Sequence, residues 1–321
     1  MGKRKYYLTL DTETATLPYA NEVCKTAAQK QKIAIAKPLV YDIGWTVSDR
    51  QGNSVFERNY LVQETFFVPN VFNTAYYKNK RPIYMEMYKN REIEAKNWND
   101  IITILTADLE MVDITTAFNA CFDFKKAIPY TERYIENLYS ENYTRWEEGQ
   151  KASCNRLLMG IKPEENPDYL EPWFELRGQK YPLADLWQIA CDRLINIDKY
   201  RDYCLKNKLL TASAIYFKTS AETCFQYLMN NYDFTEDHTA LSDARIEKDI
   251  LTKALKKGAV RPELGAFPFR LLGETHKYVQ EKRPKYAETV AELIGQYLDG
   301  VTKESTFSKR LETIYSQLIG M

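Results

Sequence analysis

The sequence predicts a mixed α/β fold, and three observations support this prediction. Three β-prone segments follow one another near the N-terminus, at residues 5–11, 39–49 and 54–62. A helical segment then leads into another short strand, and such a crossover is typical of a βαβ element. Hydrophobic residues make up 45% of the 321 residues, which is enough for a sizeable core in one large domain or two modest ones.

The first three strands are expected to pair antiparallel. Residues 5–11 alternate aromatic and aliphatic side chains with threonine, which is the pattern of a strand. The tetrapeptide RQGN at residues 50–53 has the composition of a hairpin turn. It would join a strand at 39–49 to its partner at 54–62.

Beyond the first three strands, helices and a further strand are predicted at residues 98–120 and 239–257. Residues 98–112 have helical spacing, with Asn99 or Asp100 as the N-cap. Residues 113–120 predict a short strand, followed directly by a helix. The segment at 239–257 is a strong amphipathic helix.

The remainder of the chain is predicted to be helical between loops. Amphipathic helices are expected at 183–195 and 220–232, and the segment EENPDYLEPW at 164–173 indicates a loop. Residues rich in glycine and proline break the helical pattern from 258 onward. We therefore expect one domain over 1–257 and a helical extension over 258–321.

Charge and cysteine content exclude several classes of protein. Lysine plus arginine equals aspartate plus glutamate at 44 each, so a nucleic-acid ligand would need a local basic surface or metal ions. Six cysteines without a C-x-x-C pair, beside two histidines, argue against structural zinc and favour free thiols. No glycine-rich phosphate loop, signal-peptide core or run of about 20 apolar residues is present, which predicts a cytoplasmic protein without a membrane span.

Two acids in the first strand require an explanation. Asp11 and Glu13 are two residues apart, so their side chains point to the same face of a strand. Neighbouring carboxylates repel each other, and burial strengthens the repulsion. Either this is an edge strand with a solvated face, or a cation lies between the two acids.

Two further patches supply the residues for metal chemistry. Asp123 lies in FNACFDF at a strand-to-helix turn, and DHTALSDA places His238 just before a helix that contains Asp243. Together with the first two acids, they form a set of four carboxylates and one imidazole. Carboxylate oxygens are the ligands that Mg²⁺ prefers, and two such ions roughly 3.5–4 Å apart can hold both oxygens of a phosphodiester displacement.

The segments LDTETATL, FNACFDF and DHTALSDA resemble, in the same order, the three motifs of the DEDDh 3′–5′ exonuclease family. The resemblance covers roughly residues 5–256, with long insertions at about 18–38, 66–97 and 130–182. It implies a ribonuclease H-like fold: a mixed five-stranded sheet whose first three strands are antiparallel, flanked by helices.

The resemblance also implies roles for individual residues. The family's metal-binding acids match Asp11, Glu13, Asp123 and Asp243, and its general base matches His238. The implied cofactors are two divalent cations, Mg²⁺ or Mn²⁺. One cation would be held by Asp11, Glu13 and Asp243, and the second by Asp11 with help from Asp123.

Residues beside the motifs are assigned to substrate binding: Thr12, Thr14, Leu17, Asn119 and Phe122. Leu17 matches an apolar residue that packs on the terminal base in relatives, and Asn119 precedes the second acid. Two positions depart from the family pattern, because Thr16 stands where glycine is frequent and Phe118 where histidine is frequent. These departures concern the shape of the substrate rather than the chemistry.

The resemblance predicts a metal-dependent 3′–5′ exonuclease that releases 5′ mononucleotides from single-stranded DNA or unpaired 3′ ends. DNA is favoured over RNA as the partner, but an RNA-trimming exoribonuclease and a non-catalytic nucleic-acid or partner-binding module remain open. A polymerase or replication partner could dock on residues 258–321.

Basic and aromatic residues outside the motifs have two possible roles, strand binding and ordinary packing at the surface. Tyr84, Tyr88 and Arg91 could bind the strand, although a solvated face with buried tyrosine rings explains them equally well. The remaining basic stretches are interpreted as ordinary surface: Lys25, Lys30, Lys32, Lys37 and KRPKY at 282–286.

Overall fold

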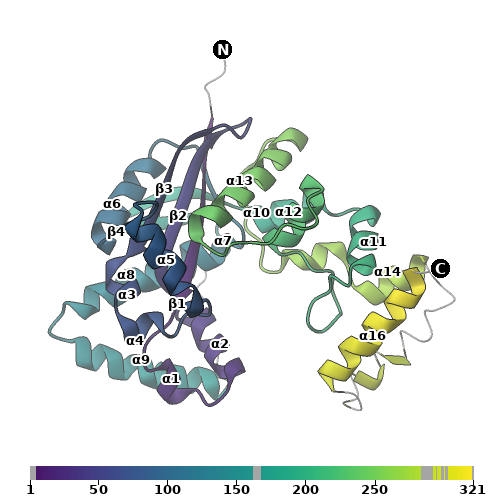
Figure 1. The fold of residues 1–321 in the computed structure, drawn as a ribbon, viewed down its shortest axis with the longest axis horizontal. Helices are drawn as coiled ribbons and strands as arrows, with labels where there is room; N and C mark the ends of the chain where they lie inside the picture. The colour runs from purple at the N-terminus through teal and green to yellow at the C-terminus, as the bar shows by residue number, and fades with distance from the viewer. Residues whose placement is uncertain are drawn as a thin grey trace. The chain divides into compact units, whose positions relative to one another are not determined.

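A seven-stranded mixed sheet organises the first of the two units into which the chain divides (Figure 1). The computed structural model describes residues 5–161, 168–282, 292–293, 295–297, 300 and 303–319. The first unit comprises residues 1–186, 236–255 and 260–264. The second comprises residues 187–235, 256–259 and 265–321.

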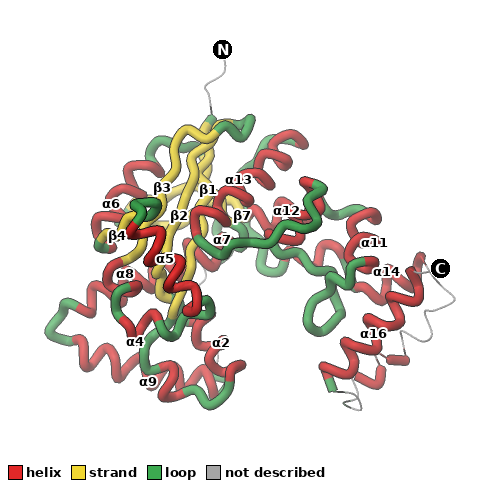
Figure 2. Tube along the Cα trace, in the orientation of Figure 1, coloured by secondary structure: helices red, strands yellow, loops and turns green. Residues whose placement is uncertain are grey.

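The strands lie in the order β4-β3-β2-β1-β5-β7-β6, with helices on both sides of the sheet (Figure 2). Their bounds are β1 Tyr6–Ala15, β2 Leu39–Asp49, β3 Ser54–Val62, β4 Glu94–Lys96, β5 Ile114–Ala117, β6 Trp173–Leu176 and β7 Gln179–Asp185. The antiparallel pairing of β1, β2 and β3 is confirmed, and β5 is parallel to β1, as the expected crossover requires. The expected count of five strands is wrong, because β4 and β6 extend the sheet at its two edges.

The sequence did not predict the strand β7, and the reason is physical. Residues 183–185 belong to β7, where the sequence predicted the start of a helix. Leu183, Ala184 and Asp185 are all fully buried, so this short parallel strand shows no alternation of polar and apolar side chains. A buried apolar run of this length does not distinguish strand from helix. The helix α10 begins only at Leu186.

The predicted hairpin turn is present between β2 and β3. Gly52 has a φ of +87°, a conformation that glycine adopts without steric cost. The Asp49 carboxylate accepts hydrogen bonds from the backbone nitrogens of Gln51 at 2.9 Å and Asn53 at 3.1 Å. These bonds fix the register in which β2 and β3 pair.

Helices of the first unit cover the sheet and lie in all three predicted insertions, which also contain β4, β6 and most of β7. They are α1 Ala20–Val23, α2 Ala27–Ala36, α3 Gln63–Phe66, α4 Pro69–Phe72, η1 Lys78–Lys80, α5 Arg81–Lys89, α6 Trp98–Leu109, α7 Ala120–Phe122, η2 Asp123–Ala127, α8 Ile128–Leu138, α9 Tyr143–Leu158 and α13 Ala240–Lys257. The N-cap of α6 is Asn97, whose side chain accepts from the Asp100 nitrogen, so the expected cap at Asn99 or Asp100 is wrong by two or three residues. The predicted loop at 164–173 lies partly outside the described residues.

The segment at 66–97 is attached to the sheet by aromatic packing. The ring of Tyr41 on β2 makes edge-to-face contacts with Phe72 at 5.0 Å and Tyr84 at 5.8 Å between centroids. Phe66 contacts Phe72 in the same way at 4.9 Å. Such pairs are worth about 0.5–1.5 kcal/mol beyond the area they bury. This insertion is therefore held firmly against β2, the strand next to β1.

The second unit is helical. Its helices are η3 Ala190–Leu194, α11 Asp198–Lys206, α12 Ala221–Met229, η4 Pro268–Leu272, α14 Thr275–Lys282 and α16 Glu304–Ile319, and the chain enters it within α10 Leu186–Ile189. Contacts between α11 and α16 join the segment at 187–235 to the C-terminal segment. The boundary near 258 stays a prediction, and parts of 258–321, including KRPKY after Lys282, lie outside the described residues.

Composition predicted free thiols and no membrane span. All six cysteines are buried and none forms a disulfide, which confirms the expectation of free thiols. Among the described residues, no helix has the length and apolar character needed to cross a membrane.

Candidate metal and active site

Asp11 and Glu13 lie in the middle of the sheet. Asp11 pairs with Gly44 and Glu13 with Asp42 of β2, and the register shifts between Glu13 and Thr14. Because β1 lies between β2 and β5, the alternative of an edge strand with a solvated face is wrong. Asp11 is half-buried and Glu13 only 9% exposed, so water poorly screens the repulsion between their two carboxylates.

The start of α13 is fixed over this part of the sheet by a buried carboxylate. Asp42 accepts hydrogen bonds from the Ala240 nitrogen at 2.9 Å and the Tyr84 hydroxyl at 2.8 Å. Burial raises the pKa of Asp42 to about 6, and the two hydrogen bonds oppose the rise. Asp42 thereby connects β2, the insertion at 66–97 and the helix that carries Asp243.

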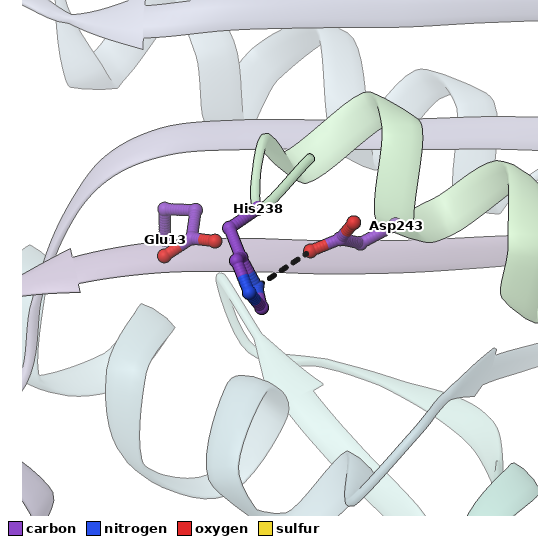
Figure 3. Close-up of side chains that lie close together, drawn as sticks. All are labelled: Glu13, His238 and Asp243. Atoms are coloured by element: carbon purple, nitrogen blue, oxygen red, sulfur yellow. Dashed lines mark ion pairs between the residues drawn. The ribbon is translucent and has the colours of Figure 1, made fainter. Parts of the chain in front are cut away.

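Glu13, His238 and Asp243 converge in space (Figure 3). Each offers one ligand atom, and these atoms all lie within 4.8 Å of one another. The His238 Nδ1 is 3.9 Å from the Asp243 Oδ2 and 3.7 Å from the Glu236 Oε2. A divalent cation requires ligand atoms at this spacing or closer, so the arrangement could hold one after small adjustments.

Asp123 lies outside the group of three residues at ligand spacing but interacts electrostatically with Asp11. It begins the π-helical turn η2, directly after α7. The Thr12 hydroxyl donates a hydrogen bond of 2.6 Å to the Asp123 Oδ1. Burial raises the pKa of Asp123 to about 7, and the bond from Thr12 opposes the rise. Sequence reasoning assigned Thr12 to the substrate and did not anticipate this role.

The carboxylates interact strongly in the absence of a cation. Burial raises the pKa of Asp11 well above its ordinary value, and Glu247, Asp123, Asp243 and Glu13 raise it further. The pKa of Glu13 is raised well above its ordinary value, first by burial and then by Asp243. Mutual repulsion of this kind is what a bound cation would relieve.

Asp243 is a buried carboxylate with one oxygen that lacks a hydrogen-bond partner among the described residues. Burial, then Glu236, raises its pKa to about 8, while Lys80 opposes the rise. Asp243 is 8% exposed, and its Oδ1 has no hydrogen-bond partner among the described residues. Buried carboxylate oxygens are rarely left without a partner, because each costs free energy.

Glu247 is a fifth acid that sequence reasoning missed. It lies on α13 four residues after Asp243 and is 2% exposed. Its Oε2 accepts a hydrogen bond of 3.1 Å from the Phe118 nitrogen at the end of β5. Burial, then Asp123, raises its pKa well above the ordinary value. The spacing i, i+4 from Asp243 is a signal that could have identified it, since such residues share a helix face.

The insertion at 66–97 surrounds the histidine. The rings of Tyr77 and His238 stack with centroids 4.3 Å apart and planes inclined by 15°. Lys80 donates a hydrogen bond to the Asp237 carbonyl, and the Tyr84 hydroxyl lies 3.4 Å from the His238 carbonyl. His238 has a φ of +48°, an uncommon backbone conformation for a residue with a side chain. These contacts hold the loop in a conformation that it would adopt poorly alone.

The residues assigned to substrate binding lie in different environments. Leu17 is fully buried in the core, so it offers no surface to a ligand in this structure. Thr14 and Phe122 are half-buried, and Asn119 is exposed with a φ of +69° before α7. Their roles stay predictions.

The other basic and aromatic residues separate into two groups. Tyr84 is fully buried, as the alternative of buried rings predicted, whereas Tyr88 and Arg91 are exposed. The expectation of ordinary surface holds for three lysines, Lys25, Lys30 and Lys32. It is wrong for Lys37, which is 7% exposed because α8 and α9 close over it.

Comparisons of the chain with models of protein families, with curated proteins and with solved structures give no match. The functional conclusion therefore depends on the residues and their geometry.

Proposed function

We propose that this chain is a metal-dependent 3′–5′ exonuclease of the DEDDh type, acting on single-stranded DNA or unpaired 3′ ends. The observation that carries the proposal is the convergence of Glu13, His238 and Asp243 within 4.8 Å, from segments more than 220 residues apart. Asp11 and Asp123 interact electrostatically with each other, and Asp11 also with Asp243. Residues of the first and third motifs thus lie at ligand spacing, and the second motif contributes Asp123 through its interaction with Asp11.

The topology of the sheet supports the same proposal. Without the edge strands, the order is β3-β2-β1-β5-β7, with the first three strands antiparallel and the last two parallel to β1. The resemblance implies a mixed five-stranded sheet whose first three strands are antiparallel, and these five strands agree with that expectation. On this assignment, β4 and β6 are additions to that sheet.

The donor set fits divalent cations such as Mg²⁺ or Mn²⁺. The site offers carboxylate oxygens, which these hard ions prefer, and the Asp243 Oδ1 has no hydrogen-bond partner among the described residues. We assign Asp11, Glu13 and Asp243 to one cation, and Asp11 with Asp123 to the second. Bound there, the cations would stabilise the charge that develops on the oxygens of the phosphodiester during hydrolysis.

The residues of the chain supply the remaining chemistry. His238 in its neutral form would accept the proton of the attacking water at a ring nitrogen. Its stack on Tyr77 would orient the ring for that transfer. The Thr12 hydroxyl would keep the carboxylate of Asp123 aimed into the site. Hydrolysis would then release a 5′ mononucleotide and shorten the strand from its 3′ end.

Oligonucleotides labelled at either end test this proposal directly. With Mg²⁺ or Mn²⁺, a 3′ label should be released at once as a mononucleotide, whereas a 5′ label should give a ladder of shortening products. EDTA should stop both reactions. Asp243→Asn should abolish hydrolysis, whereas Asp100→Asn, which removes an exposed acid from the first turn of α6, should leave it unchanged.

The same experiment separates the rival functions. Matched DNA and RNA strands distinguish a deoxyribonuclease from a trimming ribonuclease. Binding of the strand without metal-dependent hydrolysis would indicate a non-catalytic module and refute the exonuclease proposal. Docking of a replication partner on 258–321 is a separate prediction, tested by capture of that partner with the full chain and its loss on removal of this segment.

A further inference from the structure

A basic cavity of about 480 Å³ lies at the end of the sheet, where α8 and α9 pack beside the end of α2. Four cationic side chains line it: Lys37, Arg133, Arg145 and Arg156. Among the residues that the structure describes, no aspartate or glutamate lines this cavity. Such a concentration of one charge stands out in a chain whose formal net charge is zero.

The floor of the cavity is a buried lysine without a counter-ion. Lys37 is 7% exposed, and its Nζ donates a hydrogen bond of 2.6 Å to the Gln150 Oε1. Within the described part of the chain, neither Lys37 nor the three arginines forms an ion pair. Burial lowers the pKa of Lys37, and Arg133 and Arg156 lower it further. A buried cation without a compensating charge is costly, and an anion in the cavity would remove that cost.

Aromatic rings lie beside these charges. Tyr130 and Trp146 both line the cavity. Lys37 lies 5.4 Å and Arg133 5.8 Å from the centre of the Tyr130 ring. Cations interleaved with aromatic rings are the combination that proteins use for single-stranded nucleic acids, because the cations meet phosphates and the rings stack on bases.

Three residues of backbone and one hydrogen bond join the lysine of the cavity to the acid cluster. The Thr16 hydroxyl donates a hydrogen bond of 2.8 Å to the Lys37 carbonyl. Thr16 follows β1 directly and is three residues beyond Glu13, a separation of about 10 Å along an extended chain. This path limits the straight-line separation between the acids and Lys37 to a distance that a few nucleotides can span.

We propose that this cavity binds a backbone phosphate of the single-stranded substrate, a few nucleotides from the end being cleaved. The proposal rests on the exonuclease function proposed above. The exposed guanidinium groups of Arg133 and Arg145 at the mouth can each bind a phosphodiester in a bidentate manner. The cavity exceeds the size of one phosphate, which leaves room for a base against Trp146.

Strand binding can be measured in EDTA, where hydrolysis is absent. The probe is a fluorescein-labelled strand of twelve thymidylates, followed by anisotropy at several salt concentrations. Arg133→Gln with Arg145→Gln should weaken binding at least tenfold and lower the slope of log Kd against log salt by about 0.7, the value for one lost phosphate contact on a single strand. The matched control is Lys5→Gln with Arg261→Gln, which removes two exposed charges of the same unit and should change the Kd less than twofold.

A second variant leaves all four cations in place. Ser153 lines the cavity and is half-buried, so Ser153→Glu would introduce a negative charge among the arginines. This variant should weaken binding as the double substitution does. Circular dichroism and the melting temperature would check that both variants fold.

The outcomes distinguish this inference from the exonuclease proposal. An unchanged Kd in both folded variants overturns the inference, even if hydrolysis is intact. Weakened binding in both variants supports a nucleic-acid site, even if no hydrolysis is found. Displacement of the strand by 1 mM inorganic phosphate at constant ionic strength would assign the cavity to a free anion, which also overturns the inference.

Discussion

Gly44 of β2 lies against the backbone of Leu241, at the first turn of α13. A Cβ atom added at Gly44 would lie 2.3 Å from the Leu241 nitrogen and 2.5 Å from its Cα. Gly44 is also the partner of Asp11 in the β1–β2 ladder. The absence of a side chain at this position therefore lets the helix that carries Asp243 approach the strand that carries Asp11.

Gly44→Ala should displace the start of α13, because the atoms that a methyl group would meet belong to backbone. We expect a loss of about 1–3 kcal/mol in the free energy of unfolding, measured by urea denaturation, and a loss of hydrolysis of at least tenfold. Gly258→Ala is the matched control, since a Cβ there would meet nothing within 4 Å. Wild-type hydrolysis in the Gly44 variant would show that the approach of the helix does not position the acids.

Tyr77→Ala should impair the histidine without affecting the acids. Without the stacked ring of Tyr77, the His238 imidazole can rotate away from its present orientation. Misplacement of a general base costs about tenfold to hundredfold in rate. The turnover number should fall while the affinity for the strand in EDTA is retained. Tyr77→Phe keeps a ring of the same shape and should hydrolyse at nearly the wild-type rate.

Tyr76 provides the control for this prediction. It is 84% exposed and adjacent in sequence, and its ring contacts the ring of Tyr77. Tyr76→Ala should therefore leave the rate within about twofold of wild type. Equal losses in the two alanine variants would instead indicate a general effect of this segment on substrate binding.

Stability without metal should fall as the pH rises. Asp123 and Asp243 have raised pKa values of about 7 and about 8, against about 3.9 in an unfolded chain. Between these limits the folded state binds more protons than the unfolded state, so the free energy of unfolding decreases with increasing pH. Thermal melts in EDTA should show a decrease on the order of 5 °C between pH 5 and pH 8.

Divalent cations should reverse this trend. Addition of 10 mM Mg²⁺ should raise the melting temperature more at pH 8 than at pH 5, because protons compete with the metal for the carboxylates. Asp243→Asn removes one of the carboxyl groups with a raised pKa and should make the decrease seen in EDTA less steep. A melting temperature that rises with pH in EDTA would contradict the proposed origin of the raised pKa values.

Much of the sheet could be predicted because the sequence patterns that mark its strands and turns involve neighbouring residues. The alternation in β1, the RQGN turn and the crossover to β5 each depend on neighbouring residues. The failures at the edges have a different origin. β7 is a short buried strand with Pro182 inside it, and proline ordinarily argues against a strand. Its pairing with β5, with β6 and with Glu263 stabilises it there, and such pairing is not visible in one sequence.

The candidate site likewise contains residues that the sequence identified and supporting residues that only the fold brings together. The motifs identified Asp11, Glu13, Asp123, His238 and Asp243 as a set, and the fold brings Glu13, His238 and Asp243 within ligand spacing. The contacts that support the set are tertiary: Tyr77 and Glu247 come from segments that no motif covers. Composition could not reveal them, because tyrosines and helical glutamates are common on ordinary surfaces.

The two outermost strands of the sheet have a consequence for the behaviour of the chain in concentrated solution. β4 has three residues and β6 has four, and Glu94 and Lys96 on β4 form an ion pair. Edges this short, one of them charged, offer few free backbone groups to a strand from another molecule. The long apolar strands β1 and β2 are enclosed between neighbours, which protects the chain against edge-to-edge aggregation.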